Sequence, residues 1–197
     1  MLELIIACIS SYVIGSIPNG LILGKAIWGV DLRQHGSKNI GATNAWRTIG
    51  KPAGISIFVL DMLKGFLGAG LGVFYAGAPE YGVLCGILAV VGHSWSLFLR
   101  FKGGKSVSTG LGVLIMLMPV IAGLVFLVWL AIVYVTRYVS LGSIVGAALV
   151  PVLAYIFDMP PVYIGFGALA AVFIIYRHKT NIERLLNGTE SKIKAAR

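Results

Sequence analysis

The sequence contains few charged residues, and very few of them are acidic. Of its 197 residues only 12% are Asp, Glu, Lys or Arg, and just 7 are acidic. A soluble domain carries about 25% charged residues, so this scarcity excludes an ordinary soluble domain. It also leaves no soluble face on which a nucleic-acid site could form. Hydrophobic residues make up 58% of the chain, and the length suits one membrane-embedded helical domain.

Cysteine is scarce too, and internal repeats are absent. Cys8 and Cys85 both lie in apolar runs, where cysteine is usually a small buried side chain; a disulfide or metal pair is the minor alternative.

The N-terminus lacks the basic region and cleavage site of a signal peptide and carries Glu3 instead. We therefore expect that the first apolar run is not cleaved off as a signal peptide and forms a membrane-spanning helix.

Long apolar runs dominate what is present. They cover residues 2–24, 52–76, 82–99, 107–136, 140–157 and 162–176. A membrane-spanning helix needs about 20 residues, so the run 107–136 is too long for one comfortable span. Pro119 interrupts this run and predicts a turn near Met118 and Pro119.

Basic residues settle the predicted topology. They cluster after the first, third and last apolar runs, and by the positive-inside rule all three clusters face the cytoplasm. The run 107–136 must then cross twice, which predicts an all-α protein of seven transmembrane helices with the N-terminus outside and the C-terminus cytoplasmic. Five helices, with two of the runs only dipping into the membrane, is the alternative. Four polar segments fall on the cytoplasmic face: 29–51, 100–109, 137–143 and 177–190.

The first polar segment reads "GVDLRQHGSKNIGATNAWR" over residues 29–47. Its glycines allow sharp turns and close approach to a ligand, and an arginine fork suits phosphate. A helix start that followed would add exposed N–H groups. The ordinary alternative is a solvated connector with helix caps. The candidate phosphate-binding residues here are Gly36, Ser37, Asn39, Gly41, Thr43, Asn44 and Arg47.

The second segment, "FKGGKSVSTG" at residues 101–110, resembles the end of a phosphate-binding P-loop. The match fails because Leu99 stands where the first glycine of that motif belongs, so ATP hydrolysis is not indicated. Exposed N–H groups of Gly103 and Gly104, the charge of Lys105 and the hydroxyl of Ser106 would still suit an anion. The alternative is basic charge flanking a membrane helix.

The third segment, "YRHKTNIERLLNGTE" at residues 176–190, places His178 and Asn181 three apart, on one helix face. His178 is a candidate base or phosphate ligand. The alternative is that it is an interfacial polar residue with no role in binding or catalysis. Ser143, at the cytoplasmic end of the sixth predicted helix, could reach the same cavity. Asp61 and Lys64 lie within the second apolar run, where charges are expensive unless paired, so we expect an ion pair.

Taken together, these segments resemble the bacterial acyl-phosphate:glycerol-3-phosphate acyltransferase family. The likeness also includes "SIPNG" at 16–20, "DMLKG" at 61–65 and "GHSWSLFLRFKGGKSVSTG" at 92–110, and it extends over essentially the whole chain. The chain departs from the family pattern in three places. Lys38 and Ser106 each stand where the family usually has glycine, and "SWSLFL" replaces the usual "FPxFL".

The resemblance implies that 1–197 is a single membrane acyltransferase domain in the bacterial plasma (inner) membrane, with its active site on the cytoplasmic side. Its reaction transfers a fatty acyl group from acyl phosphate to the 1-hydroxyl of glycerol 3-phosphate, giving lysophosphatidate and phosphate. The resemblance implies no cofactor and no metal. It is compatible with a monomeric protein. The implied catalytic residues are His178, Asn181, Lys105 and Arg47, and Ala42 joins the substrate-binding set.

Two functions from other classes remain as alternatives. A small transporter or flippase for an anionic solute would suit a glycine-rich bundle with a basic mouth, but such proteins usually show internal repeats and polar groups near the midplane. A non-catalytic membrane scaffold would leave the polar loops unexplained.

Overall fold

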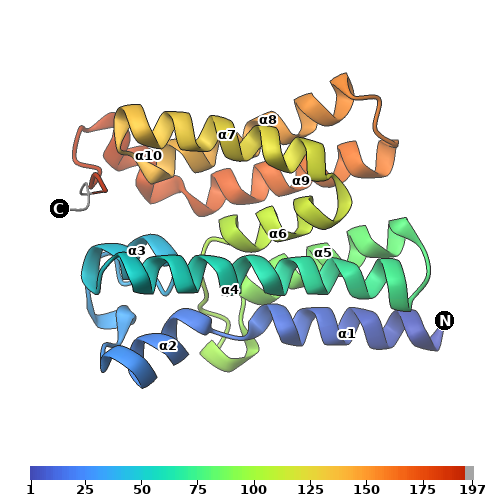
Figure 1. The fold of residues 1–197 in the computed structure, drawn as a ribbon, viewed down its shortest axis with the longest axis horizontal. Coiled ribbons are helices and arrows are strands. Elements are labelled where there is room, and N and C mark those ends of the chain that lie inside the picture. The colour runs from blue at the N-terminus through green and yellow to red at the C-terminus, as the bar shows by residue number, and fades with distance from the viewer. Residues whose placement is uncertain (194–197) are drawn as a thin grey trace. The chain divides into compact units, whose positions relative to one another are not determined.

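The computed structural model describes residues 1–193, and every regular element within them is helical (Figure 1). The predicted all-α class is therefore confirmed. The chain divides into two compact units, Met1–Leu117 and a second that begins at Met118, and each is described by itself. Two residues of the third basic cluster, Lys194 and Arg197, lie outside the described residues.

The first unit contains the longer list of elements. They are α1 (Leu2–Ser16), α2 (Asn19–Trp28), η1 (Leu32–Gln34), α3 (Ala42–Thr48), α4 (Lys51–Gly70), η2 (Leu71–Tyr75), α5 (Pro79–Ser94), η3 (Leu97–Leu99) and α6 (Val107–Leu117). Prolines occupy the first turns of α4 and α5, where a missing N–H costs no helical hydrogen bond. The predicted loop 29–51 thus contains η1 and α3 and ends where α4 begins.

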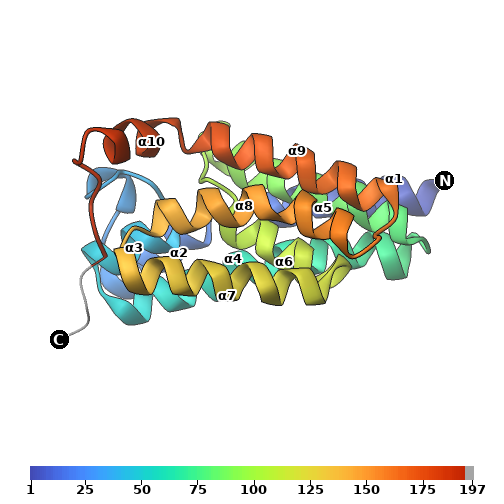
Figure 2. The same ribbon diagram turned by 90° about the horizontal axis from the view of Figure 1, so that it is seen from above.

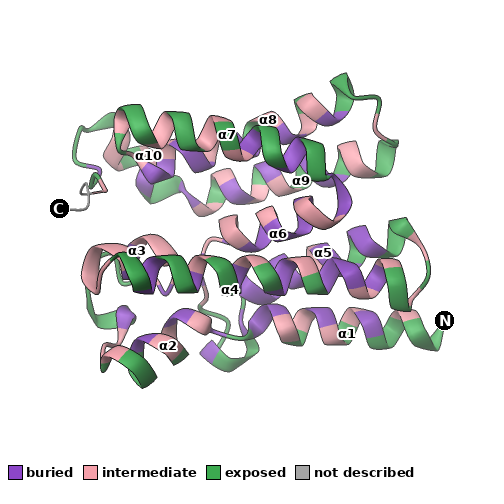
Figure 3. Cartoon of the chain, viewed as in Figure 1, coloured by how far each residue is buried: buried purple, intermediate pink, exposed green. Residues whose placement is uncertain are grey.

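The helices of the first unit pack through glycine. A Cβ added at Gly15 of α1 would lie 2.2 Å from the carbonyl oxygen of Ala89 in α5, and one at Gly65 of α4 would lie 2.0 Å from that of Thr109 in α6. Small residues let membrane helices approach closely, where van der Waals contact replaces the absent hydrophobic driving force. Along α1 and α4 buried residues alternate with exposed ones, whereas α5 is buried or half-buried from Cys85 onward (Figure 3).

The two cysteines meet within this packing. The Sγ atoms of Cys8 in α1 and Cys85 in α5 lie 3.9 Å apart, and both residues are free thiols. The interpretation of both residues as small side chains between helices is therefore supported over a disulfide.

The first apolar run, expected as a spanning helix, contains a break in the structure. Helix α1 ends at Ser16, α2 begins at Asn19, and the two are bent by 41°. Pro18 cannot donate a backbone hydrogen bond and forces Ile17 into an extended conformation with ψ 118°. The break therefore follows from the sequence "SIPNG", and it leaves carbonyl groups inside the apolar region that need other partners.

The second unit contains α7 (Pro119–Thr136), α8 (Val139–Ile156), α9 (Pro161–Arg177) and α10 (Lys179–Leu186). Helix α8 packs against both α7 and α9, and the three run alongside one another (Figure 2). A Cβ at Gly142 would lie 2.9 Å from the Trp129 ring, so a small residue is required at that contact. Between α9 and α10 the chain bends by 61° at His178.

Four helical segments among the described residues are long and apolar enough to cross a membrane. They are Lys51–Tyr75, Pro79–Leu99, Pro119–Thr136 and Val139–Ile156, and the two bent pairs would raise the number to six. Helix α6 has 11 residues, about 16 Å against the roughly 30 Å of a bilayer core. The predicted interruption near Met118 and Pro119 is confirmed, since α6 ends at Leu117 and α7 begins at Pro119. The count of seven stays a prediction.

Candidate active site

The first polar loop is held in shape by the side chain of Asn44 in α3. Asn44 is 2% exposed, and its Nδ2 lies 3.1, 3.0 and 2.8 Å from the carbonyl oxygens of Leu32, His35 and Asn39. Its Oδ1 accepts a 3.0 Å hydrogen bond from the backbone N–H of Ser37. The sequence predicted Asn44 as a donor to a ligand, but its amide is used within the loop. Asn44 is therefore a support of the loop.

Two left-handed residues turn this loop sharply. Gly36 has φ 56° and Lys38 has φ 58°. A Cβ at Gly36 would lie 2.3 Å from Asn44 Oδ1, so glycine is needed there for space as well as for conformation. Lys38 adopts the left-handed conformation with a side chain, at a cost of about 1–2 kcal/mol. Ser37 is exposed between the two turns.

Helix α3 carries the candidate cation of the first loop. Before it, Asn39 Oδ1 accepts a 2.8 Å hydrogen bond from the N–H of Gly41, which precedes the helix. Ala42 and Thr43 form its first turn, and Arg47 lies in its last turn; all three are half-buried. The helix has 7 residues, so its dipole is small. Ala45 of this helix belongs to a buried apolar cluster with Leu32, Ala53 and Ile57, which anchors the helix.

Other basic residues near this loop already have acidic partners. Asp31 Oδ2 lies 3.1 Å from Lys25 Nζ and 2.7 Å from an Arg33 nitrogen. Hydrogen bonds from Arg33, helped by Lys25, hold the pKa of Asp31 well below its usual range despite the opposing effect of burial. The same pair raises the pKa of Arg33. These two cations are therefore neutralised locally by Asp31.

The glycines of the second loop serve packing, which corrects the expectation that their N–H groups are exposed. The N–H of Gly103 donates to the carbonyl of Ser94 at 3.0 Å, and that of Gly104 donates to the carbonyl of His93 at 3.1 Å. A Cβ at Gly103 would lie 2.0 Å from the His93 carbonyl oxygen, and one at Gly104 would lie 2.2 Å from His93 Nε2. Only glycine lets the loop lie this close to the end of α5.

Ser106 also turns inward, contrary to the expected role of its hydroxyl in anion binding. Its Oγ donates to the carbonyl of Val90 at 2.8 Å and lies 2.7 Å from Ser94 Oγ. Its φ of 62° is left-handed, a conformation that glycine adopts more readily than serine. Lys105 is half-buried between Gly104 and Ser106. Its backbone is therefore fixed on both sides by buried hydrogen bonds.

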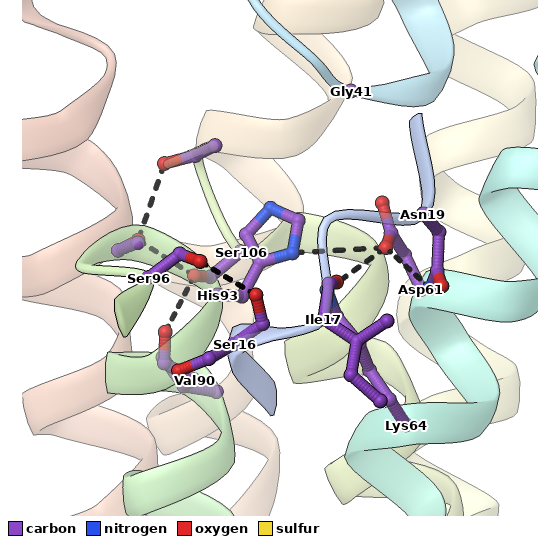
Figure 4. Close-up of polar contacts among 12 residues, drawn as sticks. Ser16, Ile17, Asn19, Gly41, Asp61, Lys64, Val90, His93, Ser96 and Ser106 are labelled. Atoms are coloured by element: carbon purple, nitrogen blue, oxygen red, sulfur yellow. Dashed lines mark hydrogen bonds and ion pairs between the residues drawn. The ribbon is translucent and has the colours of Figure 1, made fainter. Parts of the chain in front are cut away.

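The predicted ion pair of Asp61 and Lys64 is confirmed, and it stabilises the break in the first helix (Figure 4). Lys64 Nζ lies 3.0 Å from Asp61 Oδ1 and donates a 2.8 Å hydrogen bond to the carbonyl of Ile17. Asn19, at the start of α2, donates from Nδ2 to Asp61 Oδ1 at 3.1 Å. Lys64 thus gives a second hydrogen bond to a carbonyl at the break, which also accepts the N–H of Asn19 at 3.1 Å.

Sequence reasoning missed three residues that complete this region: Asn19, His93 and Ser96. Ser96 Oγ donates to the carbonyl of Ser16 at 2.6 Å, which satisfies another carbonyl at the break. His93 Nδ1 lies 3.8 Å from Asp61 Oδ1. The proline of "SIPNG" was the available signal, because a break inside a membrane requires polar partners from elsewhere in the chain.

In the second unit His178 and Asn181 both lie at the junction of α9 and α10, and both are buried. His178 Nδ1 lies 2.8 Å from the carbonyl oxygen of Ile174. Because a carbonyl only accepts, Nδ1 carries the hydrogen, and in the neutral ring Nε2 carries the lone pair. Asn181 Nδ2 donates to Glu190 Oε1 at 2.8 Å.

Glu190 is a buried acid that sequence reasoning did not single out. Its Oε1 accepts hydrogen bonds from Asn181 and from Ser140 at 2.9 Å, and its Oε2 lies 2.7 Å from Arg184 Nε. Burial alone would raise the pKa of Glu190, but these hydrogen bonds outweigh it and lower the pKa. Ser143 lies one turn after Ser140, and its hydroxyl donates to the carbonyl of Val139 in its own helix at 2.9 Å.

No group of three or more His, Cys, Asp and Glu side chains within residues 1–193 could hold a metal ion. The candidate residues in each unit are cations and hydrogen-bonding groups on a backbone held by hydrogen bonds. Together with the apolar helices, these features define an integral membrane protein with rigid cation-bearing segments, which suit an anionic ligand.

Comparison with known proteins identifies the family. A family model described as glycerol-3-phosphate acyltransferase matches residues 5–188, so the chain belongs to that family. It is 43% identical over 184 residues to a glycerol-3-phosphate acyltransferase of Fusobacterium nucleatum subsp. nucleatum, covering 93% of this chain and 95% of that one. It is 48% identical over 186 residues to one of Desulforamulus reducens, covering 94% and 92%.

Solved structures that are similar to this chain belong to the same family of acyltransferases. The chain is similar to the crystal structure of PlsY (YgiH), an integral membrane glycerol 3-phosphate acyltransferase, in its glycerol 3-phosphate form, with 39% identity, a TM-score of 0.91 and coverage of 97% of this chain and 96% of that one. The lysophosphatidic acid form gives 38% identity, a TM-score of 0.88 and coverage of 96% and 94%. The predicted function, acyl transfer to glycerol 3-phosphate, is thereby confirmed, and the comparisons favour an enzyme over the transporter and the scaffold.

Proposed function

We propose that the acyl donor is acyl phosphate and that the acceptor atom is the 1-hydroxyl of glycerol 3-phosphate. The hydroxyl oxygen attacks the acyl carbonyl, the bond from that carbonyl to the phosphate oxygen breaks, and the hydroxyl proton passes to the departing phosphate. The products are lysophosphatidate and inorganic phosphate. An acyl phosphate is an activated mixed anhydride, so positioning and charge stabilisation are the main tasks of the protein.

The observation that supports this proposal most is the rigid support beneath two half-buried cations. Arg47 stands on a helix next to a loop braced by buried Asn44. Lys105 stands between Gly104, packed on His93, and Ser106, bonded to Val90. Fixed cations stabilise developing negative charge without having to reorganise during the reaction. Two substrates that each carry phosphate need such groups.

The remaining candidate residues have assisting roles in this proposal. The exposed turn of Gly36 and Ser37 and the segment Asn39–Thr43, which contains Gly41 and Ala42, contact a substrate phosphate. In the second unit His178 orients substrate through hydrogen bonds, Asn181 supports that arrangement, and Ser143 contributes a hydroxyl. The buried contact from Glu190 to Asn181 fixes the orientation of that amide.

The proposal also includes a topology and a place. We propose seven crossings of the bacterial plasma membrane, with the N-terminus outside, the C-terminus and active site cytoplasmic, and the chain acting as a monomer. Support comes from the basic clusters and from α6, whose preceding loop packs inward against α5. A short helix continued by an inward loop can serve as one crossing.

The test is kinetic. Purified protein is supplied with acyl phosphate and glycerol 3-phosphate, and formation of lysophosphatidate is followed for Arg47→Ala and Lys105→Ala. Hydrogen bonds to charged groups contribute about 1.5–3 kcal/mol, so each variant is expected to lose about tenfold to a hundredfold in kcat/KM. Lys51→Ala and Lys102→Ala remove exposed cations nearby and serve as controls. Near-normal kinetics for both test variants would refute the assignment of the cations.

A further inference from the structure

Three segments of the first unit converge on one carboxylate oxygen inside the apolar region. Asp61 Oδ1 accepts from Asn19 of α2 at 3.1 Å, pairs with Lys64 of α4 at 3.0 Å and faces Nδ1 of His93 at the end of α5 at 3.8 Å (Figure 4). Asp61 and His93 are 3% and 4% exposed. A charge this deep in a membrane protein is expensive to keep and usually has a function.

The first of these connections leads to the loop that precedes α3, the helix of Arg47. Asn19 begins α2, which lies directly on the backbone of the first loop. A Cβ at Gly20 would lie 1.8 Å from the carbonyl oxygen of Ile40, and one at Gly24 would lie 2.8 Å from that of Val30. Because α2 and the loop are in backbone contact, a shift of Asn19 moves the first loop as well.

The second connection leads to the loop that carries Lys105. The His93 ring meets Asp61 with Nδ1, and its Nε2 lies against Gly104, where a Cβ would be only 2.2 Å away. The His93 carbonyl also accepts the N–H of Gly104 at 3.1 Å. The imidazole is therefore a rigid spacer between Asp61 and the residue that precedes Lys105.

We propose that Asp61 is a positioning residue, which sets the separation between the Arg47 segment and the Lys105 segment through Asn19 and His93. The proposal rests on the proposed function, in which these two cations hold substrate phosphates. Asp61 itself does not contact substrate. A merely structural role, in which Asp61 only neutralises Lys64, predicts an effect on stability and none on the kinetics of folded enzyme.

The first variants break one connection each and leave the ion pair intact. They are Asn19→Leu, close in shape, and His93→Gln, which loses the nitrogen that faces Asp61. The control is Asp158→Asn, on an exposed turn of the second unit. For each variant the melting temperature, kcat and the KM for each substrate are measured, and rates are expressed per folded protein. A displacement of about 1 Å in a catalytic site can cost about 10²-fold, so losses of about tenfold or more in kcat/KM are expected from both variants.

A double-mutant cycle then locates the effect. The combined change Asp61→Asn and Lys64→Gln removes both charges of the ion pair, so neither charge is left buried alone. This combined change is one perturbation of the cycle, and His93→Gln is the other. If His93 acts through Asp61, the combined variant loses much less than the product of the separate losses in kcat/KM. Independent, multiplying losses would overturn the proposal, as would folded Asn19→Leu and His93→Gln enzymes with kcat and both KM values within about twofold of the wild type.

The outcomes separate this proposal from the one on which it rests. Large losses in Arg47→Ala and Lys105→Ala, with normal kinetics in Asn19→Leu and His93→Gln, refute the positioning role and leave the proposed function standing. Normal kinetics in Arg47→Ala and Lys105→Ala refute the assignment of the cations whatever the other variants do.

Discussion

Replacing Glu190 with glutamine is expected to destabilise the second unit and lower activity together. The carboxylate accepts hydrogen bonds from Ser140 of α8 and Asn181 of α10 and pairs with Arg184. It therefore joins two helices to the segment that follows α10. Glutamine keeps the shape and one acceptor oxygen but removes the charge.

The magnitude follows from these contacts. A hydrogen bond to a charged group contributes about 1.5–3 kcal/mol and a neutral one about 0.5–1.5 kcal/mol, so the bonds from Ser140 and Asn181 each weaken by about 1 kcal/mol. The Arg184 side chain is 41% exposed, and such a pair adds only about 0.2–1 kcal/mol. The sum is roughly 2–3 kcal/mol, or a fall in melting temperature of roughly 5–10 °C for a chain of this size.

The effect has a definite pH dependence. The pKa of Glu190 is lowered in the folded protein, so its contribution to the free energy of unfolding is complete above the ordinary glutamate pKa of about 4.3. The contribution is lost as the pH falls through the lower pKa of the folded state. The difference in melting temperature between wild type and Glu190→Gln should therefore be full at neutral pH and shrink in acid.

The assay is thermal unfolding of purified protein in detergent, with kcat/KM measured on the same samples. Glu183→Gln, on the exposed side of α10, is the control and should match the wild type. A fall in kcat/KM is expected in Glu190→Gln because the hydrogen bond that fixes Asn181 becomes weaker. A melting temperature within about 1 °C of the wild type, or a difference that persists unchanged at low pH, would refute the reasoning.

Three further predictions follow from the packing, the topology and the histidine. Gly104→Ala should lower the melting temperature and kcat/KM, because its Cβ would lie 2.2 Å from His93 Nε2, whereas Gly123→Ala, where a Cβ meets no atom within 4 Å, should change neither; equal behaviour of the two variants would contradict the close packing. In a cysteine-accessibility scan positions 78 and 159 should label from outside and positions 38, 103 and 180 from inside; labelling of position 138 from outside would favour a different number of crossings. His178→Gln should keep measurable turnover and a pH–rate profile of unchanged shape over about pH 5–8, where histidine titrates. Complete loss of turnover, with glycerol 3-phosphate still bound and a wild-type limb in that range, would instead make His178 the base.

The sequence by itself was sufficient for features that depend on local composition. Apolar runs indicated the helices, because a segment of about 20 apolar residues is stable only away from water. Pro119 correctly predicted the interruption between α6 and α7. The pairing of Asp61 with Lys64 was predictable as well, since the two are one helical turn apart and an unpaired charge there would be costly.

Only the tertiary structure decided which polar groups face a ligand and which support the fold. Asn44, Ser106 and the N–H groups of Gly103 and Gly104 all looked like donors for an anion, yet each is bonded to the chain itself. Their partners lie up to 16 residues away, as Val90 does from Ser106, and composition does not reveal which carbonyl will come within reach.

The same limit applies to the residues that sequence reasoning missed. His93 matters because α5 brings its ring between Asp61 and Gly104, and Glu190 matters because the chain after α10 returns to Ser140, 50 residues earlier. A buried polar group must find a partner, and the sequence states that need. Which partner satisfies it depends on helix packing at ångström precision, and that packing is set by contacts between residues far apart in the chain.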